Sequence, residues 1–257
     1  MIFDGRQFAL QLEDQLQGKL TGKKVVAILD PTNLAGMTYT HLKKKVAKRL
    51  GVEFVITGSQ DIAGLNADPS VDGIMVQLPH PNSGSLISQI DLHKDIDGMR
   101  EDSLYKPAVV KAVLRILEKT SPSFPLLSLG EGGSRRMGEV VIVGSHGFVG
   151  RKLMHELRVS GMDKRDFDPS ILLMADVVIS ATGQAGLISP EMVKPGVVAI
   201  DLGFPKGDFD PAVADKASFF TPVPGGVGPV TVVSLFENLL QSTHVSKSPP
   251  TRAKVRL

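Results

Sequence analysis

The feature that most constrains the fold is a series of short apolar runs that alternate with helical patterns. Each run holds four to six residues, is rich in Val and Ile and ends near a turn signal; the runs are 24–29, 52–56, 73–77, 139–143, 177–180 and 197–200. Apolar strands that alternate with helices form parallel sheets covered on both faces. We therefore expect an α/β protein.

Helical patterns lie between these runs. Apolar residues recur every four positions from Phe8 to Leu20, and helices are also expected at 38–50, at 109–117 and after Gly147. Residues 121–137 are instead polar and rich in Gly, which indicates a loop or a junction between domains.

Composition excludes several classes of protein. The net charge of +2 is too small to indicate nucleic-acid binding, and the basic stretch 247–256 is expected to be a tail. No apolar run is long enough to span a membrane, and Asp4 places a charge where a signal peptide would be apolar. We expect a cytoplasmic protein. The absence of Cys excludes disulfides and thiolate chemistry.

One stretch, residues 221–231, combines three Pro and three Gly and leads into an apolar helix. Proline fixes φ, and glycine lets a backbone approach a ligand without a Cβ between them. The stretch therefore predicts a rigid loop beside a ligand or, alternatively, a buried turn between domains.

The helix expected at 38–50 carries the sharpest local chemistry. At 100° per residue an apolar arc contains Leu42, Val46, Ala47 and Leu50, and Tyr39 and Lys43 fall inside it, whereas Lys44, Lys45 and Lys48 fall outside. An inward lysine is costly to bury in its charged form, so its pKa falls and it can transfer protons near pH 7. The alternative is a lysine that reaches solvent from the edge of the arc.

Two further polar positions follow buried strands. Gln77 ends one strand, where side chains of a parallel sheet line the ligand crevice. Asp95 and Asp97 precede Gly98, either as site residues or as turn residues. No His or further acid completes a set of ligands around these acids, so we predict no metal.

A glycine-rich turn joins the strand at 139–143 to the following helix. A helix N-terminus reached through such a turn suits a dinucleotide pyrophosphate, although a tight turn alone would look similar. The candidate cofactor-binding residues here are Gly144, Ser145, His146, Gly147, Val149 and Gly150.

Other candidate cofactor residues follow later strands. Asp166 or Asp168 could bind the ribose 2′-hydroxyl from the end of a second strand, or could cap the turn at Pro169. Small residues that would let a nucleotide approach, or that form tight turns, are Ala181, Thr182, Gly183 and Gly203.

Four stretches together carry a resemblance that covers most of the chain from Ile2 to Leu240. They are Tyr39-x-x-x-Lys43-x-Lys45, the run Asp-Gly-Ile-Met-Val-Gln-Leu-Pro-His-Pro at 72–81, Lys-Asp-Ile-Asp-Gly at 94–98 and the Pro-Gly stretch at 221–229. Their order, and the opening Asp4-Gly5, resemble bifunctional methylenetetrahydrofolate dehydrogenase/methenyltetrahydrofolate cyclohydrolases.

The resemblance implies two α/β domains with a folate cleft between them. Residues 1–118 and 230–257 would form the folate-binding catalytic domain, and 119–229 a Rossmann-like cofactor domain. The last helix, from near Val230, would cross back to the first domain. The family also implies a homodimer and a role in one-carbon metabolism and purine biosynthesis, while charge and hydropathy predict no nucleic-acid or membrane partner.

The resemblance also implies roles for matching residues. Lys43 would be the catalytic lysine, Tyr39 would pack on the folate, Gln77 would tune the lysine, and Asp97 would bind the pterin. Further substrate-binding positions would be Leu78, Pro79, Gly226, Gly228 and Pro229.

One departure from the family concerns the cofactor. The phosphate turn has Gly144-Ser145-His146 where the family usually has Gly-Arg-Ser, so the arginine that suits a 2′-phosphate is missing. The family implies NADP, whereas an acid at Asp166 or Asp168 favours NAD. The departure leaves the alternative of a relative that has lost dehydrogenase activity, either a cyclohydrolase alone or a non-catalytic folate- or nucleotide-binding protein. An unrelated Rossmann oxidoreductase is a further alternative, which explains residues 144–150 but not the motifs of the first domain.

Overall fold

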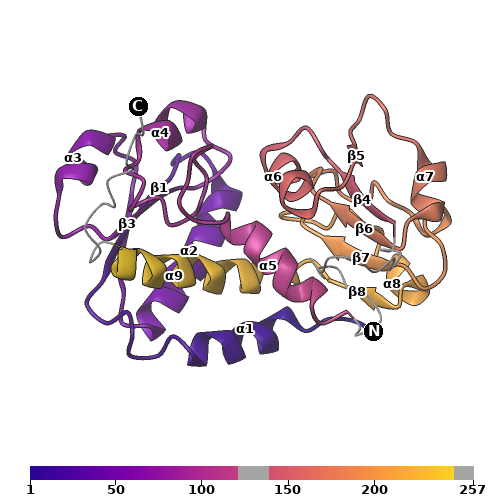
Figure 1. Ribbon diagram of the computed structural model, residues 1–257, viewed down its shortest axis with the longest axis horizontal. Coiled ribbons are helices and arrows are strands. Elements are labelled where there is room, and N and C mark those ends of the chain that lie inside the picture. Colours follow the sequence, from indigo (N-terminus) through magenta and orange to yellow (C-terminus); the bar gives the residue numbers. More distant parts are fainter. Residues whose placement is uncertain (121–138, 246–257) are drawn as a thin grey trace, which may run out of the picture. The chain divides into compact units, whose positions relative to one another are not determined.

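The computed structural model describes residues 1–120 and 139–245 (Figure 1). The loop expected at 121–137 and the basic tail at 247–256 lie outside the described residues. The chain divides into two compact units. We call Met1–Leu12 with Val109–Ser234 the five-stranded unit, and Glu13–Ala108 with Leu235–Leu257 the three-stranded unit.

The three-stranded unit holds a parallel sheet in the order β2-β1-β3. Its strands are β1 (Lys24–Ile28), β2 (Glu53–Thr57) and β3 (Gly73–Val76), and its helices include α2 (Leu34–Arg49), α3 (Ile62–Ala67) and α4 (Ser83–Gln89). Every residue of β3 is buried, which explains its continuous apolar run. Asp95 extends the sheet through a parallel bridge to Ile74.

Helix α2 begins four residues before the predicted start at Thr38, because Asn33 caps it. The Asn33 side-chain oxygen accepts a hydrogen bond from the Gly36 amide at 2.7 Å, which satisfies an amide that has no partner within the helix. The Asn33 side-chain amide also donates to the Pro79 carbonyl at 2.9 Å. One side chain therefore starts α2 and holds the segment that follows β3.

The five-stranded unit holds a parallel sheet in the order β5-β4-β6-β7-β8 (Figure 1). Its strands are β4 (Val140–Val143), β5 (Gly161–Met162), β6 (Val177–Ser180), β7 (Val198–Asp201) and β8 (Phe219–Phe220). Its shorter helices are α6 (Phe148–Leu157), α7 (Pro169–Met174), η1 (Pro190–Met192) and α8 (Val213–Lys216). Alternate residues of β4 and β6 enter a core with Leu172, Ile188 and Phe209. The parallel α/β architecture predicted from the apolar runs is confirmed.

The N-terminus belongs to the five-stranded unit. Ile2 forms a parallel bridge with Phe220, and the Phe3 amide donates to the Phe220 carbonyl at 2.8 Å. A Cβ on Gly5 would overlap the backbone of Gly225 and Gly226, so only glycine permits this contact. The Asp4-Gly5 opening is thereby explained by packing against the Pro-Gly stretch.

Three helices contain the division between the units. They are α1 (Gly5–Asp14), α5 (Ala108–Leu117) and α9 (Val227–Val245). Helix α9 begins in the five-stranded unit and ends in the three-stranded unit, as the prediction of a returning last helix requires.

Several predicted details are wrong. Helix α1 ends at Asp14, and Leu20 is buried from a turn beyond it, where Gly18 and Gly22 adopt positive φ. Leu42 was placed on the buried arc of α2 but is 47% exposed. Helix α9 starts at Val227, three residues before the predicted Val230.

Asn238 on α9 is expected to contribute strongly to stability. Its buried side-chain amide donates to the carbonyls of Ile96 and Lys106, both at 2.9 Å. Replacing Asn238 with Ala removes the donor for two carbonyls, and a buried acceptor without a partner costs about 1–3 kcal/mol. Urea unfolding followed by circular dichroism should show a loss of this size.

The exposed Gln241 lies on the same helix and provides the control. Gln241→Ala should leave the unfolding midpoint nearly unchanged. Equal midpoints for the Asn238 and Gln241 variants would contradict the role given to Asn238.

Candidate active and cofactor sites

Lys43 is buried inside the three-stranded unit, with only 3% of its surface exposed. Its Nζ donates to Gln77 Oε1 at 3.0 Å and to Met75 Sδ at 3.6 Å, and it lies 4.9 Å from the centroid of the Tyr39 ring. Tyr39 and Lys43 are one turn apart on α2, so the helix presents both to the end of β3. The predicted inward placement of these two residues is confirmed.

The partners of Lys43 are neutral. Within residues 1–120 and 139–245, no carboxylate forms an ion pair with its amine. Burial lowers the pKa of Lys43, and the negative charge of Asp97 opposes this effect only in part. The result is an amine that loses its proton more readily than an exposed lysine does.

Hydrogen bonds of both its backbone and its side chain fix the position of Gln77. Its backbone amide donates to the Ile28 carbonyl at 2.8 Å, and its side-chain amide donates to the Leu78 carbonyl at 2.9 Å. The Thr40 hydroxyl lies 3.3 Å from Gln77 Oε1, beside the lysine amine. Sequence periodicity alone did not identify Thr40 and Met75 as neighbours of this site, because their placement depends on how α2 packs on β3.

The turn that carries Asp97 is anchored by its neighbours. Buried Asp95 accepts hydrogen bonds from the amides of Met99 and Arg100, and burial raises its pKa despite these bonds. The Lys94 amine donates to three carbonyls of α3 and the residue after it. Asp97 is half-buried, and its carbonyl accepts from the Ala108 amide at 3.1 Å.

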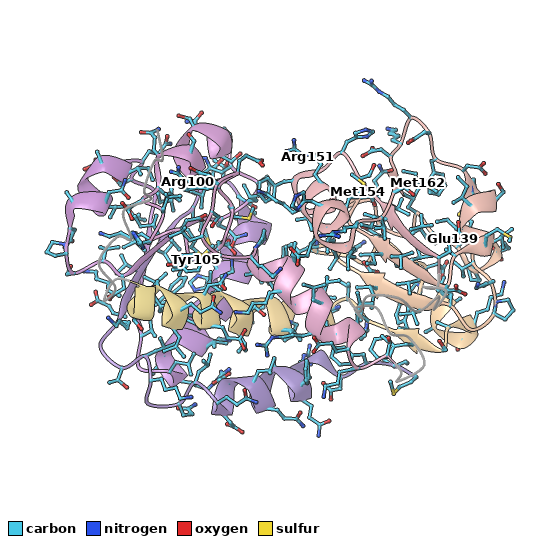
Figure 2. All side chains as sticks on the ribbon, in the orientation of Figure 1. Arg100, Tyr105, Glu139, Arg151, Met154 and Met162 are labelled. Carbon is cyan, nitrogen blue, oxygen red and sulfur yellow. The ribbon has the colours of Figure 1, made fainter. Side chains whose placement is uncertain are left out.

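Arg100 and Tyr105, labelled in Figure 2, follow this turn. The Arg100 guanidinium donates to the carbonyls of Ser88 and Ile90, and the Tyr105 hydroxyl donates to the His93 carbonyl at 3.3 Å. Burial and, to a smaller extent, nearby carboxylates raise the pKa of Tyr105 to about 12. Both side chains stabilise the segment around Asp97, and neither was predicted from the sequence.

A cavity of about 430 Å³ lies at the carboxyl ends of the strands of the five-stranded unit. Its lining residues are Val143, Gly144, Gly147, Asp163, Lys164, Phe167, Ala181, Thr182, Gln184 and Leu187. Val143 pairs with Met162 on β5 and with Ser180 on β6, so these strand ends are level. This is where ligands bind in parallel α/β sheets.

The three glycines of the predicted phosphate turn each have a steric reason. Gly144 adopts φ +90°, and a Cβ there would approach the Ala181 carbonyl oxygen to 2.6 Å. Gly147 is the N-cap of α6 and makes no side-chain capping bond. A Cβ on Gly150 would overlap the Gly144 carbonyl. These are the roles of glycines in a dinucleotide-binding turn: a tight bend, an open helix N-terminus and close packing of the helix.

The loop after β6 is held by a buried acid that sequence reasoning missed. Asp208 Oδ2 accepts hydrogen bonds from the Ser180 hydroxyl at 2.8 Å and from the Thr182 amide at 2.7 Å. The Gly183 amide lies 3.3 Å from the same oxygen. Asp208 therefore fixes the backbone of Ala181–Gly183 residues, of which Ala181 and Thr182 line the cavity.

Other predicted cofactor positions do not line this cavity. They are Ser145, His146, Val149, Gly150, Asp168, Gly183 and Gly203. Ser145 is buried, with its amide donating to the Met162 carbonyl. A Cβ on Gly203 would approach the Asp208 amide to 2.6 Å, so this glycine is required by packing.

The sequence analysis expected Asp166 or Asp168 at the end of the second strand of the cofactor domain, but neither residue lies there. The strand is β5, which ends at Met162, so Asp163 comes directly after it. Asp166 Oδ1 accepts from the Asp163 amide at 2.6 Å, and Asp168 is the N-cap of α7, accepting from the Ser170 amide. A two-residue strand carries too little periodicity to be recognised, which is why Asp163 was missed.

The Pro-Gly stretch is shorter as a loop than expected. Gly226 donates its amide to the Pro222 carbonyl at 2.7 Å, and a Cβ on Gly226 would meet Thr221 at 2.8 Å. Gly228 and Pro229 lie in the first turn of α9, where a proline costs no hydrogen bond. Thr221 Oγ1 accepts from the Asp201 amide at 2.7 Å, which fixes the start of the stretch to β7.

Residues 1–120 and 139–245 contain no group of three His, Asp or Glu placed to hold a metal ion. None of the helices in those ranges is long and apolar enough to cross a membrane.

Comparison with known proteins gives matches to both parts of the chain. Residues 3–97 match the family model "Tetrahydrofolate dehydrogenase/cyclohydrolase, catalytic domain", and residues 131–247 match "Tetrahydrofolate dehydrogenase/cyclohydrolase, NAD(P)-binding domain". The two matches together span most of the chain.

Solved structures agree with these matches. The bifunctional methylenetetrahydrofolate dehydrogenase/cyclohydrolase FolD from Campylobacter jejuni is 28% identical, with a TM-score of 0.82 over 96% of this chain and 99% of its own. A 5,10-methylenetetrahydrofolate dehydrogenase from the silkworm Bombyx mori is 27% identical, with a TM-score of 0.77 over 95% and 98%. The NAD-dependent enzyme from Saccharomyces cerevisiae shares the fold at 20% identity and a TM-score of 0.78, over 96% and 99%.

Gly150→Ala should disrupt the turn at the cavity. The added Cβ would overlap the Gly144 carbonyl oxygen, so α6 must shift away from the turn. Overpacking of this kind costs about 1–3 kcal/mol. We expect a lower melting temperature and weaker binding of NADH or NADPH in a fluorescence titration.

Gly84→Ala is the matched control, because a Cβ at Gly84 in α4 meets nothing within 4 Å. This variant should keep the parent melting temperature and dinucleotide affinity. If Gly150→Ala behaves like Gly84→Ala, the turn is not sterically constrained as described.

Proposed function

The chain belongs to the tetrahydrofolate dehydrogenase/cyclohydrolase family, and we propose that Lys43 is the residue through which it acts on the one-carbon group. The protein is a methylenetetrahydrofolate dehydrogenase and methenyltetrahydrofolate cyclohydrolase. It oxidises 5,10-methylenetetrahydrofolate with a nicotinamide cofactor, and it hydrolyses the product to 10-formyltetrahydrofolate. The alternative of an unrelated Rossmann oxidoreductase is therefore wrong.

The observation that carries the role of Lys43 is its burial among neutral groups. Oxidation removes a hydride from the methylene carbon and leaves a methenyl cation on the folate. A charged ammonium at this position would repel that cation, whereas a neutral amine does not. Burial among neutral partners lowers the pKa of Lys43 and so favours the neutral amine that this step requires.

The second reaction needs a base. Water adds to the methenyl carbon, the bond from that carbon to N5 breaks, and one proton is released as 10-formyltetrahydrofolate forms. A neutral Lys43 amine can accept a proton from the attacking water. Gln77 Oε1, at 3.0 Å, accepts one amine hydrogen and so orients the nitrogen lone pair.

The remaining folate contacts are proposed from the family pattern. Tyr39 offers a half-buried ring 4.9 Å from the Lys43 amine, suited to stacking on a flat heterocycle. Asp97 is suited to accept hydrogen bonds from the amino and imino groups of the pterin. Leu78, Pro79, Gly226, Gly228 and Pro229 complete the proposed set of substrate-binding positions.

The cavity of the five-stranded unit fits a nicotinamide dinucleotide. Gly144 and Gly147 leave the N-terminus of α6 open to a pyrophosphate, and the fixed Ala181–Thr182 backbone forms another wall. A dinucleotide held there would supply the acceptor for the hydride of the methylene carbon. The protein contributes the orientation of that ring through these backbone contacts.

A homodimer in the cytoplasm that supplies formyl groups for purine biosynthesis completes the proposal. The homodimer and the role in purine biosynthesis rest on the family resemblance. Sedimentation equilibrium of the purified protein tests the first, and a monomer at micromolar concentration would refute it.

Lys43→Met should abolish hydrolysis but stabilise the fold. Loss of a general base lowers the rate about 100-fold or more. The unfolded lysine has its ordinary pKa of 10.5 and the folded one is lower, so the folded state loses stability as the pH falls below 10.5. Methionine removes this penalty. We expect a higher melting temperature at pH 7 and a smaller gain as the pH rises towards 10.5.

Lys44→Met on the exposed face of α2 is the control and should change neither the rate nor the melting temperature. The assay follows the disappearance of methenyltetrahydrofolate absorbance. Full hydrolase activity in Lys43→Met would refute the role of Lys43. Absence of both activities in the parent protein would instead favour a binding protein that has lost turnover.

Gln77→Glu tests the neutral partner. A carboxylate 3.0 Å from the Lys43 amine would favour the ammonium form and raise the pKa of Lys43. The rising limb of the pH–rate profile for hydrolysis should move to higher pH, with a fall of about tenfold or more at pH 7.

The exposed Gln89 offers the same substitution away from the site. Gln89→Glu should keep the parent profile. A Gln77→Glu profile that falls equally at every pH would indicate disrupted folate binding and not a change in the lysine.

A further inference from the structure

Asp163 lies at the position from which an acid binds the adenosine ribose in dinucleotide sites, and its role rests on the proposed function. It follows β5 directly, and Met162 pairs with Val143 at the carboxyl end of β4. Asp163 lines the cavity together with Gly144 and Gly147 of the phosphate turn. An acid at the end of the second strand bonds the ribose hydroxyls in such folds.

The Asp163 carboxylate is held in place by the backbone. Its Oδ2 accepts from the His146 amide at 3.0 Å, and its Oδ1 accepts from the Lys164 amide at 2.7 Å. The backbone amides of Lys164 and His146 lower the pKa of Asp163, so the group is ionised at neutral pH. A carboxylate has about four acceptor positions, so this one retains capacity for hydroxyl donors. Its side chain is 28% exposed.

The two other acids of the segment are committed elsewhere. Asp166 accepts from the Asp163 amide and so supports the turn, while Asp168 caps α7. Figure 2 labels Met162, beside this turn, and Met154 on α6, and Met154 Sδ lies 3.0 Å from where a Cβ on Gly161 would be. The β5 end is therefore packed tightly against α6, and Asp163 cannot easily move away from the cavity.

We propose that Asp163 binds the adenosine ribose through its hydroxyl groups, excludes a 2′-phosphate and makes NAD the preferred cofactor. A phosphate placed beside a fixed carboxylate suffers charge repulsion, which costs far more than a lost hydrogen bond. A free 2′-hydroxyl instead donates to the same oxygens.

Positive groups near Asp163 could attract a 2′-phosphate and therefore reduce the preference for NAD over NADP. The His146 ring lies 3.4 Å from Asp163 Oδ2 and is 74% exposed, and Lys164 lines the cavity while remaining exposed. Arg165 is exposed and does not line the cavity. Exposed side chains lose freedom when they clamp a phosphate, whereas the carboxylate is already fixed.

Equilibrium binding of the two reduced dinucleotides tests the proposal. The chain contains no Trp, so the fluorescence of the bound nicotinamide can be titrated directly. The parent protein should bind NADH about tenfold or more tightly than NADPH. Asp163→Asn keeps the size and an acceptor oxygen but removes the charge, and it should reduce this ratio about tenfold, mainly through tighter NADPH binding.

Two further variants separate the candidate acids. Asp168→Ser removes a charge but keeps a good N-cap. Asp210→Ser also removes a charge, at a residue whose side chain accepts from the Ala212 amide. The ratio of affinities should stay at the parent value in both. A change in Asp168→Ser with none in Asp163→Asn would overturn the assignment of Asp163.

A competition experiment avoids the risk that a variant misfolds. On the parent protein, adenosine 5′-monophosphate should displace NADH more effectively than adenosine 2′,5′-bisphosphate does. Tighter binding of NADPH, or equal competition by the two adenosine phosphates, would refute the role of Asp163 and leave the dehydrogenase function intact. Failure to bind either dinucleotide would overturn the dehydrogenase function and this proposal together.

Discussion

The burial of one amine against a neutral amide is the interaction on which the catalytic site depends. A carboxylate partner could offset the free-energy cost of burying Lys43. Such an ion pair would, however, keep the lysine charged. Gln77 satisfies the amine with an amide oxygen at 3.0 Å and leaves its pKa low. Burial of this amine is costly to the fold, and the proposed role explains it, because a neutral amine suits a cationic folate intermediate.

Holding such a group requires rigid surroundings, which acids and amides provide in both units. Asn33 caps α2 and binds the Pro79 carbonyl, and Asp95 binds two amides of the turn beyond Asp97. In the five-stranded unit, Asp208 and Asp163 each accept two or more hydrogen bonds from backbone amides and side chains near the cavity. Each loop is thus ordered by hydrogen bonds between a short side chain and the backbone, which preorganises the site.

Sequence patterns predicted the features of the fold that arise from a regular spacing of residues, namely the strands and the inward face of α2. Apolar runs located six of the eight strands described, and the helical period placed Tyr39 and Lys43 on the inward face of α2. The helical period predicted the wrong environment for Leu42, which is exposed although the 100° spacing places it on the buried arc of α2. Asp163 and Asp208 could not be found in this way, because each acts through register and loop geometry and not through local periodicity.

The substitution of Ser145-His146 in the phosphate turn can be understood from the same geometry. What the turn requires is the absence of a Cβ at Gly144 and Gly150, since both positions press against backbone. The side chain at position 146 is exposed and can change without altering that backbone. In the proposals made above, catalysis depends on Lys43 and its neighbours in the three-stranded unit, whereas cofactor choice depends on this turn and on Asp163. Selection can therefore change the cofactor while the environment of Lys43 stays the same.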